Sequence, residues 1–181
     1  MKFRKIYPGF LVLSMLVGVW GCSNTQKSPD VTNGIRSSLD QAGLKDVKVD
    51  QDREKGVVTL SGDVLTDGDK AQAESIAKSI AGSQVVANQI AIRPMGEEST
   101  AKKVDSDRDK AIEKNLDAVL VQHKLDKGVS YDVKNGVITL TGKVNSPARR
   151  ALVEKLATDV PDVKQVVNEL EVKGQKATSS D

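Results

Sequence analysis

Hydrophobic and polar residues follow the same order twice along the chain. In each copy, apolar residues recur at helical spacing, then alternate with polar residues, and then fill a short run that contains glycine. These short runs are GVVTLSGDV at residues 56–64 and GVITLTGKV at residues 136–144. The order predicts a helix, a pair of strands joined by a turn, a second helix and a last strand in each copy.

The opening helix of each copy is predicted from apolar residues that are three or four positions apart and therefore share one helical face. These residues are Val31, Ile35 and Leu39 in the first copy and Ile112, Leu116, Val119 and Leu120 in the second. Gly43 is expected to end the first of these helices.

A β-hairpin is expected after each opening helix. Strand-like alternation is seen at Val47 and Val49 in the first copy and at Val129, Tyr131 and Val133 in the second. The turns are expected at 54–56 and at Asn135-Gly136, a pair of residues that favours a type I′ turn.

Capping signals mark the start of the second helix in each copy. Thr66 precedes Asp69 at the spacing of a capping box, and Ser146 precedes Pro147 as an N-cap residue precedes a first-turn proline. The last strands are expected over 85–92 and 163–172.

The two copies align without a gap at an offset of 80 residues, with 11 identities in the 38 positions from Gly56 to Arg93. A repeat of this length predicts a small domain for each copy. The predicted fold class is α+β, with two tandem αββαβ domains at 29–93 and 105–173 and a linker at 94–104. Each domain is expected to hold a three-stranded mixed sheet with two helices on one face, leaving the other face to solvent or to docking.

The N-terminus predicts a cleaved signal peptide over 1–21. Basic residues precede an apolar stretch of about eleven residues at 10–20, which is too short to cross a bilayer stably. The sequence VWGC at 19–22 resembles the bacterial lipobox, which implies a diacylglycerol on Cys22. The alternatives are an ordinary secretory signal that leaves a free thiol, or an uncleaved anchor. Residues 22–28 are then a lipidated tether, and residues 174–181 are expected to be disordered.

The sign of the net charge changes when the residues of the predicted signal peptide are excluded. The chain has 27 basic and 25 acidic residues, and Lys2, Arg4 and Lys5 leave with the leader, so the remaining net charge is about −1. A nucleic-acid partner is therefore not expected. Residues 29–98 hold 8 basic and 12 acidic residues, whereas residues 101–173 hold 14 and 12, so the second copy is the more basic one.

No catalytic set is found in the sequence. His123 is the single histidine and Cys22 the single cysteine, so the usual triads and multi-residue metal sites lack their parts. Asp67 and Asp69 are explained by capping and by compensation of the helix dipole. We therefore expect no enzyme, no cofactor, no metal site and no small-molecule substrate.

The motif G-V-[VI]-T-L-[ST]-G-x-V, followed by an alanine-containing helix and V-x-N-x-[IL], resembles the BON domain. Together with the lipobox, the two copies resemble dual-BON outer-membrane lipoproteins. The resemblance implies a non-enzymatic protein at the periplasmic face of the outer membrane, with binding of anionic phospholipid and a role in membrane integrity or osmotic stress tolerance. The residue after Cys22, which is not aspartate, resembles an outer-membrane sorting signal.

The expected lipid-binding surface lies in the second copy. It combines cations with small apolar residues away from the buried stripe of the opening helix, and two further cations from the first turn of the second helix. These residues are Lys110, Lys114, Ala118, Val121, Lys124, Arg149 and Arg150. The two arginines face the positive end of a helix dipole, which implies an anion or an acidic neighbour. Two alternatives stay open: a periplasmic scaffold that binds an envelope protein partner, and a cation-binding module.

Overall fold

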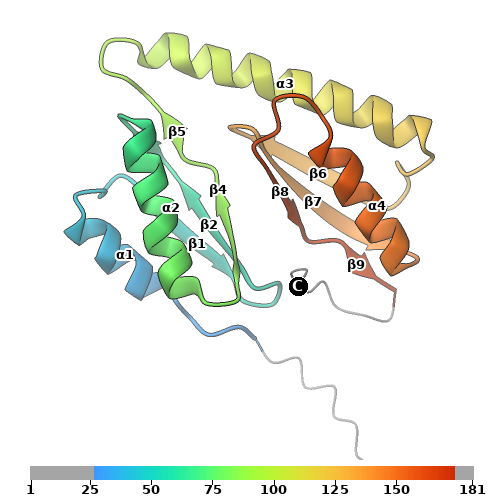
Figure 1. The fold of residues 1–181 in the computed structure, drawn as a ribbon, viewed down its shortest axis with the longest axis horizontal. Coiled ribbons are helices and arrows are strands. Elements are labelled where there is room, and N and C mark those ends of the chain that lie inside the picture. The colour runs from blue at the N-terminus through green and yellow to red at the C-terminus, as the bar shows by residue number, and fades with distance from the viewer. Residues whose placement is uncertain (1–26, 174–181) are drawn as a thin grey trace, which may run out of the picture.

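The computed structural model describes residues 27–173 and forms two αββαβ repeats from them (Figure 1). The predicted signal peptide, Cys22, most of the tether and the tail at 174–181 lie outside the described residues. The elements of the first repeat are α1 (Thr32–Gln41), β1 (Lys48–Asp52), β2 (Val57–Ser61), β3 (Asp63–Val64), α2 (Asp67–Ala81), β4 (Val85–Asn88) and β5 (Ala91–Ile92). Those of the second are α3 (Glu98–Gln122), β6 (Val129–Lys134), β7 (Val137–Val144), α4 (Pro147–Thr158), β8 (Gln165–Asn168) and β9 (Glu171–Val172).

The predicted fold class is confirmed by the strand pairing. The strand order is β1-β2-β4 in the first repeat and β6-β7-β8 in the second, with an antiparallel hairpin and a last strand parallel to the middle one. Where one last strand was expected, each repeat has two short segments. The second segment, β5 or β9, pairs with β3 or with the end of β7.

An asparagine causes this break in the last strand. The Asn88 Oδ1 accepts a hydrogen bond from the backbone N–H of Ile90 at 3.3 Å, and its Nδ2 donates to Glu74 on α2 at 2.8 Å. The second repeat has the same contacts. The Asn168 Oδ1 accepts from the backbone N–H of Leu170 at 3.2 Å, and its Nδ2 donates to Glu154 at 2.7 Å. The asparagine and glutamate that both copies share therefore attach the second helix to the bend.

The predicted helix starts are also confirmed. The Thr66 hydroxyl accepts from the Asp69 N–H and the Asp69 carboxylate accepts from the Thr66 N–H, both at 3.1 Å, which is a capping box. Ser146 accepts from the N–H of Arg149 at 3.2 Å, with Pro147 as the first helical residue. These bonds satisfy donors that a helix would otherwise leave unpaired.

Helix α3 begins earlier than the sequence predicted. Residues 98–104, which were expected in the linker, are helical, so the connection between the repeats is short. Between Glu98 and Gln122 there is no glycine or proline, whereas Pro94 and Gly96 stand directly before the helix. Since glycine and proline are the residues that most disfavour a helix, the start at Glu98 follows from their positions.

Each repeat buries its own core between two helices and one face of its sheet. Ile35, Leu39 and Leu60 are at most 1% exposed in the first core, and Ile112 and Leu116 are buried to the same degree in the second. The predicted apolar faces of both opening helices are therefore confirmed.

The opposite faces of the two sheets pack against each other. A small apolar cluster forms there from Val57 on β2, Ala87 on β4, Val137 on β7 and Val167 on β8, all at most 5% exposed. The face that was expected to be wet or used for docking is thus partly covered by the other repeat. Figure 1 shows the sheets between the helices of the two repeats.

The side chain of Gln165 completes this contact. Its Oε1 accepts from the N–H of Asn88 at 3.1 Å, and its Nε2 donates to the carbonyl of Val86 at 2.7 Å. These two groups belong to β4, which is an edge strand of the first sheet. An amide from the second repeat therefore pairs with backbone groups that the first repeat leaves unpaired.

Candidate functional site

The residues predicted to face a membrane share the outward face of α3. Lys110, Lys114, Ala118 and Val121 are all exposed, and they recur at spacings of three and four residues, so they form one stripe. The buried residues Ile112, Leu116 and Leu120 occupy the opposite side of the helix. Val121 is 54% exposed, and Lys124 follows just after the helix with a φ of 55°. We call Lys110, Lys114, Ala118, Val121 and Lys124 the outward face of α3.

Acidic residues of α3 lie to one side of this face. Glu113 and Asp117 lie close enough to Tyr131 on β6 for their charges to act on its hydroxyl. Burial, followed by the charges of these two carboxylates, raises the pKa of Tyr131. Within residues 27–173, no carboxylate lies within ion-pair distance of Lys110, Lys114 or Lys124. The positive charge of the outward face is therefore not neutralised by direct ion pairs.

The two arginines of α4 do not join this face as a pair. Arg149 donates to the carbonyls of Lys124 and Lys127 at 3.1 and 3.3 Å, so it lies beside the end of α3. Arg150 points to β8 and donates to the carbonyl of Asn168 at 3.0 Å. The structure therefore brings Arg149, but not Arg150, to the end of the outward face at Lys124.

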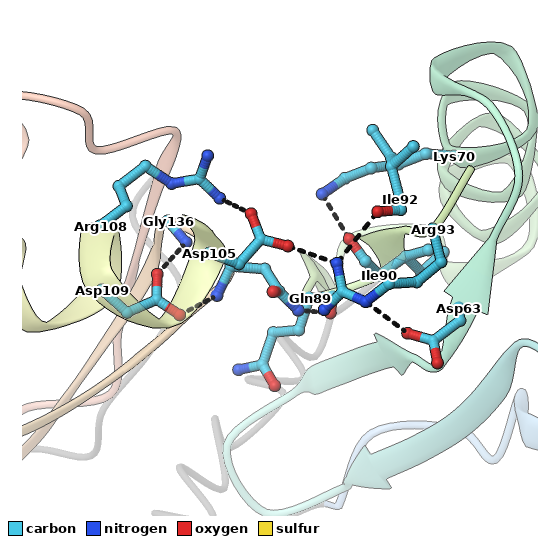
Figure 2. A network of polar contacts seen from close by, with 11 residues as sticks. Asp63, Lys70, Gln89, Ile90, Ile92, Arg93, Asp105, Arg108, Asp109 and Gly136 are labelled. Atoms are coloured by element: carbon cyan, nitrogen blue, oxygen red, sulfur yellow. Dashed lines mark hydrogen bonds and ion pairs between the residues drawn. The ribbon is translucent and has the colours of Figure 1, made fainter. Parts of the chain in front are cut away.

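An ion network at the start of α3 joins the two repeats (Figure 2). Asp105 accepts hydrogen bonds from Arg93, which follows β5, and from Arg108 one turn further along α3. The Arg93 Nε also lies 3.8 Å from a carboxylate oxygen of Asp63 in the first repeat. We call Asp63, Arg93, Asp105 and Arg108 the junction network. The sequence did not indicate it, because it depends on α3 reaching back to Glu98.

Further polar contacts cross between the repeats at positions that correspond at the offset of 80. Asn135 Nδ2 donates to the carbonyl of Gln89 at 2.8 Å, and Lys55 binds Glu169 at 2.6 Å. The hydrogen bond and charge of Glu169 raise the pKa of Lys55. Asp109 on α3 holds the hairpin turn, because its carboxylate accepts the N–H groups of residues 135 and 136 at 2.8 and 2.9 Å.

Acid is expected to weaken the junction network. Burial alone would raise the pKa of Asp105, but the hydrogen bond from Arg93 and the charges of Arg108 and Arg93 outweigh it and hold this pKa below its ordinary value. The contribution of Asp105 to stability is therefore present above the pKa of the unfolded chain, about 4, and is lost as the pH falls through the lower folded pKa. Urea denaturation from about pH 5 down to about pH 2 measures this loss.

The matched variant for this prediction is Asp105→Asn, which keeps the shape of the side chain and removes its titration. The wild-type chain should lose more free energy of unfolding over that pH range than the variant does. Equal losses in both chains would contradict the prediction.

Other candidate chemistry can be placed in the same way. Asp67 and Asp69 lie in the first turn of α2, and His123 is exposed at the end of α3. Among residues 27–173, no group of three or more histidine, cysteine, aspartate or glutamate side chains is arranged to hold a metal ion. In the same range, no helix has the length and apolar character needed to cross a bilayer.

Comparison with known proteins agrees with the two-repeat architecture. A model of the BON domain matches residues 28–94 and 108–174. The chain belongs to the BON-domain family. Both BON domains carry the asparagine-to-glutamate contact and the glycine-bounded hairpin strand described above.

Among curated proteins, this BON-domain chain is similar to osmotically-inducible protein Y of Escherichia coli K12. The two are 27% identical over 146 residues, which cover 79% of this chain and 71% of that protein. It is also 36% identical over 70 residues to an uncharacterized protein in the gshII 5′ region of Anaplasma centrale, covering 39% of this chain and 46% of that one.

Among solved structures, two of CdsD, a structural protein of the type III secretion system of Chlamydia trachomatis, match at 19% identity. The TM-scores are 0.31 and 0.32. The match covers 77% of this chain in both cases, and it spans 64% and 60% of the CdsD chains, less than two thirds of either.

Proposed function

We propose that this BON-domain protein is a non-enzymatic protein of the bacterial envelope that binds anionic phospholipid surfaces through the outward face of α3. The observation that carries the proposal is that Lys110 and Lys114 accompany the exposed Val121 on a helix whose other face is buried, with Lys124 just after its end. Each lysine close to an anionic surface contributes about 1 kcal/mol, so three of them support weak, salt-dependent binding.

Weak binding is sufficient if the chain is already held at the membrane. The predicted lipid on Cys22 would anchor the protein to the periplasmic face of the outer membrane and keep α3 at a high effective concentration near the bilayer. Intact mass spectrometry of the membrane fraction tests this anchor. We expect a chain that begins at Cys22 and carries acyl mass, and an unmodified chain would contradict it.

A role in membrane integrity or osmotic stress tolerance is the physiological part of the proposal. It is supported by the similarity to a protein named as osmotically inducible. Binding to phospholipid would place such a protein at the surface that osmotic stress deforms.

The alternative of a periplasmic scaffold is less well supported. A scaffold that docks partner strands would use the free sheet face or a free edge. The apolar part of that face is covered by the other repeat, and Gln165 occupies the edge of β4. The outward face of α3, in contrast, is exposed and combines an apolar residue, Val121, with lysines.

Vesicle co-flotation tests lipid binding with a chain that starts at Ser23 and therefore lacks the anchor site. We expect it to float with vesicles that contain anionic phospholipid at low salt and to be released at high salt. The variant Val121→Asp with Lys124→Glu changes the charge of the outward face by three. Binding should weaken by about tenfold or more.

The matched control is Ser37→Asp with Lys45→Glu, which makes the same change of charge at exposed positions of the first repeat. This control should float as the wild-type chain does. If the α3 variant also floats unchanged, the assignment to α3 is wrong, whereas equal losses in both variants would indicate only an effect of net charge.

A further inference from the structure

A cavity of about 280 Å³ lies where the two repeats meet at the start of α3. Three cationic residues line it, each from a different element: Lys70 from α2, Arg108 from α3 and Lys164 from the loop before β8. Two carboxylates, Glu97 and Asp105, also line it. The cavity is separate from the outward face of α3, because none of the residues that define that face lines it.

The positive charge of Lys70 is only partly compensated in this cavity. Its Nζ donates to the carbonyl of Ile90 at 2.7 Å, and no carboxylate of the described residues lies within ion-pair distance of it. Its pKa is lowered mainly by burial and then by the charge of Lys164, while the charges of Asp105 and Glu74 act in the opposite direction. The ammonium group is therefore partly buried close to a second cation.

Arg108 also has an unused donor. One end of its guanidinium group binds Asp105, while its Nε is buried and has no hydrogen-bond partner among the described residues. A buried donor without an acceptor costs free energy that a ligand oxygen could recover. Figure 2 shows Lys70 and Arg108 on either side of the Arg93–Asp105 ion pair.

We propose that this cavity binds a phosphate group, held by Lys70, Arg108 and Lys164. A phosphate oxyanion accepts several hydrogen bonds and supplies negative charge in addition to that of Asp105. Asp105 offsets only part of the positive charge, because its carboxylate is shared between Arg93 and Arg108. Glu97 is exposed at the start of α3 and can turn to solvent.

The phosphate group can belong to a soluble phosphate or to a phospholipid headgroup, and the test has an arm for each source. Inorganic phosphate is titrated into the chain from Ser23 to Asp181 and followed by calorimetry and by the amide resonances around the cavity. Vesicles of anionic phospholipid are the second arm. The test variant is Lys164→Gln, since Lys164 is exposed and forms no ion pair with a described residue.

We expect Lys164→Gln to weaken binding by about tenfold, because it removes one charged donor from the phosphate. The matched control is Lys155→Gln, an exposed lysine of α4 that does not line the cavity, and it should bind as the wild type does. Thermal unfolding curves of both variants check that they fold.

Two results support the proposal and separate the sources. Loss of inorganic phosphate binding in Lys164→Gln but not in Lys155→Gln, with vesicle binding unchanged in both, identifies a soluble phosphate. If free phosphate does not bind, but vesicle binding falls in Lys164→Gln and not in Lys155→Gln, the ligand is a headgroup. The proposal is overturned if both variants and the wild type behave alike in both arms, or if both variants are weakened equally. Loss of vesicle binding in the α3 variant has no bearing on it.

Discussion

Replacing Val167 with aspartate is expected to lower the free energy of unfolding by about 3 kcal/mol or more and to uncouple the two repeats. Val167 is 1% exposed and packs with Val57, Ala87 and Val137 in the cluster between the sheets. A carboxylate in this apolar cluster would lose its hydration without gaining a partner. Urea denaturation should then show two transitions, since each repeat keeps its own core, where the wild type shows one.

The control for Val167→Asp is Val121→Asp, which places the same carboxylate at a position that is 54% exposed. Its effect should stay below about 1 kcal/mol, because water still solvates the charge. A single transition in Val167→Asp with the wild-type midpoint would mean that the sheets do not pack in solution as the structure has them.

Replacing Gly142 with alanine should cost about 3 kcal/mol. Gly142 lies in β7 with a φ of +117°, and a Cβ built there would be 2.3 Å from the carbonyl oxygen of Gly128. Both the backbone conformation and the close approach therefore exclude a side chain. The midpoint of urea denaturation measures the effect.

Gly43→Ala separates the two causes. Gly43 also has a positive φ, +80°, but a Cβ there would meet no atom within 4 Å. Its cost should be about 1 kcal/mol, which is the penalty for the left-handed conformation alone. Equal costs for Gly43→Ala and Gly142→Ala would show that the backbone contact contributes nothing. Gly62→Ala, which has the same 2.3 Å approach in the first repeat, should resemble Gly142→Ala.

The helices and strands could be predicted because their signals are local. Ile35 and Leu39 are four positions apart, and this spacing alone predicts that they share one face of a helix. The capping residues Thr66 and Ser146 act within one turn of the helix that they start. The order of these elements, read twice, was sufficient for the fold class.

The contacts between the repeats could not be predicted in the same way, because they join residues that are far apart in sequence. Val57 and Val137 each stand next to another apolar residue within a strand, which indicates a strand buried on both faces but not what covers the second face. Arg93 and Asp105 meet only because α3 extends to Glu98. No periodicity in the sequence connects Lys70 with Lys164.

The cluster between the sheets is built from matched positions of the two copies. Val57 corresponds to Val137 and Ala87 to Val167 at the offset of 80 residues. Equivalent residues of the two copies therefore pack against each other, which is the geometry of an isologous interface in a twofold homodimer. Duplication has placed both partners of such a dimer in one polypeptide. Because the connection keeps them together, their association does not depend on protein concentration.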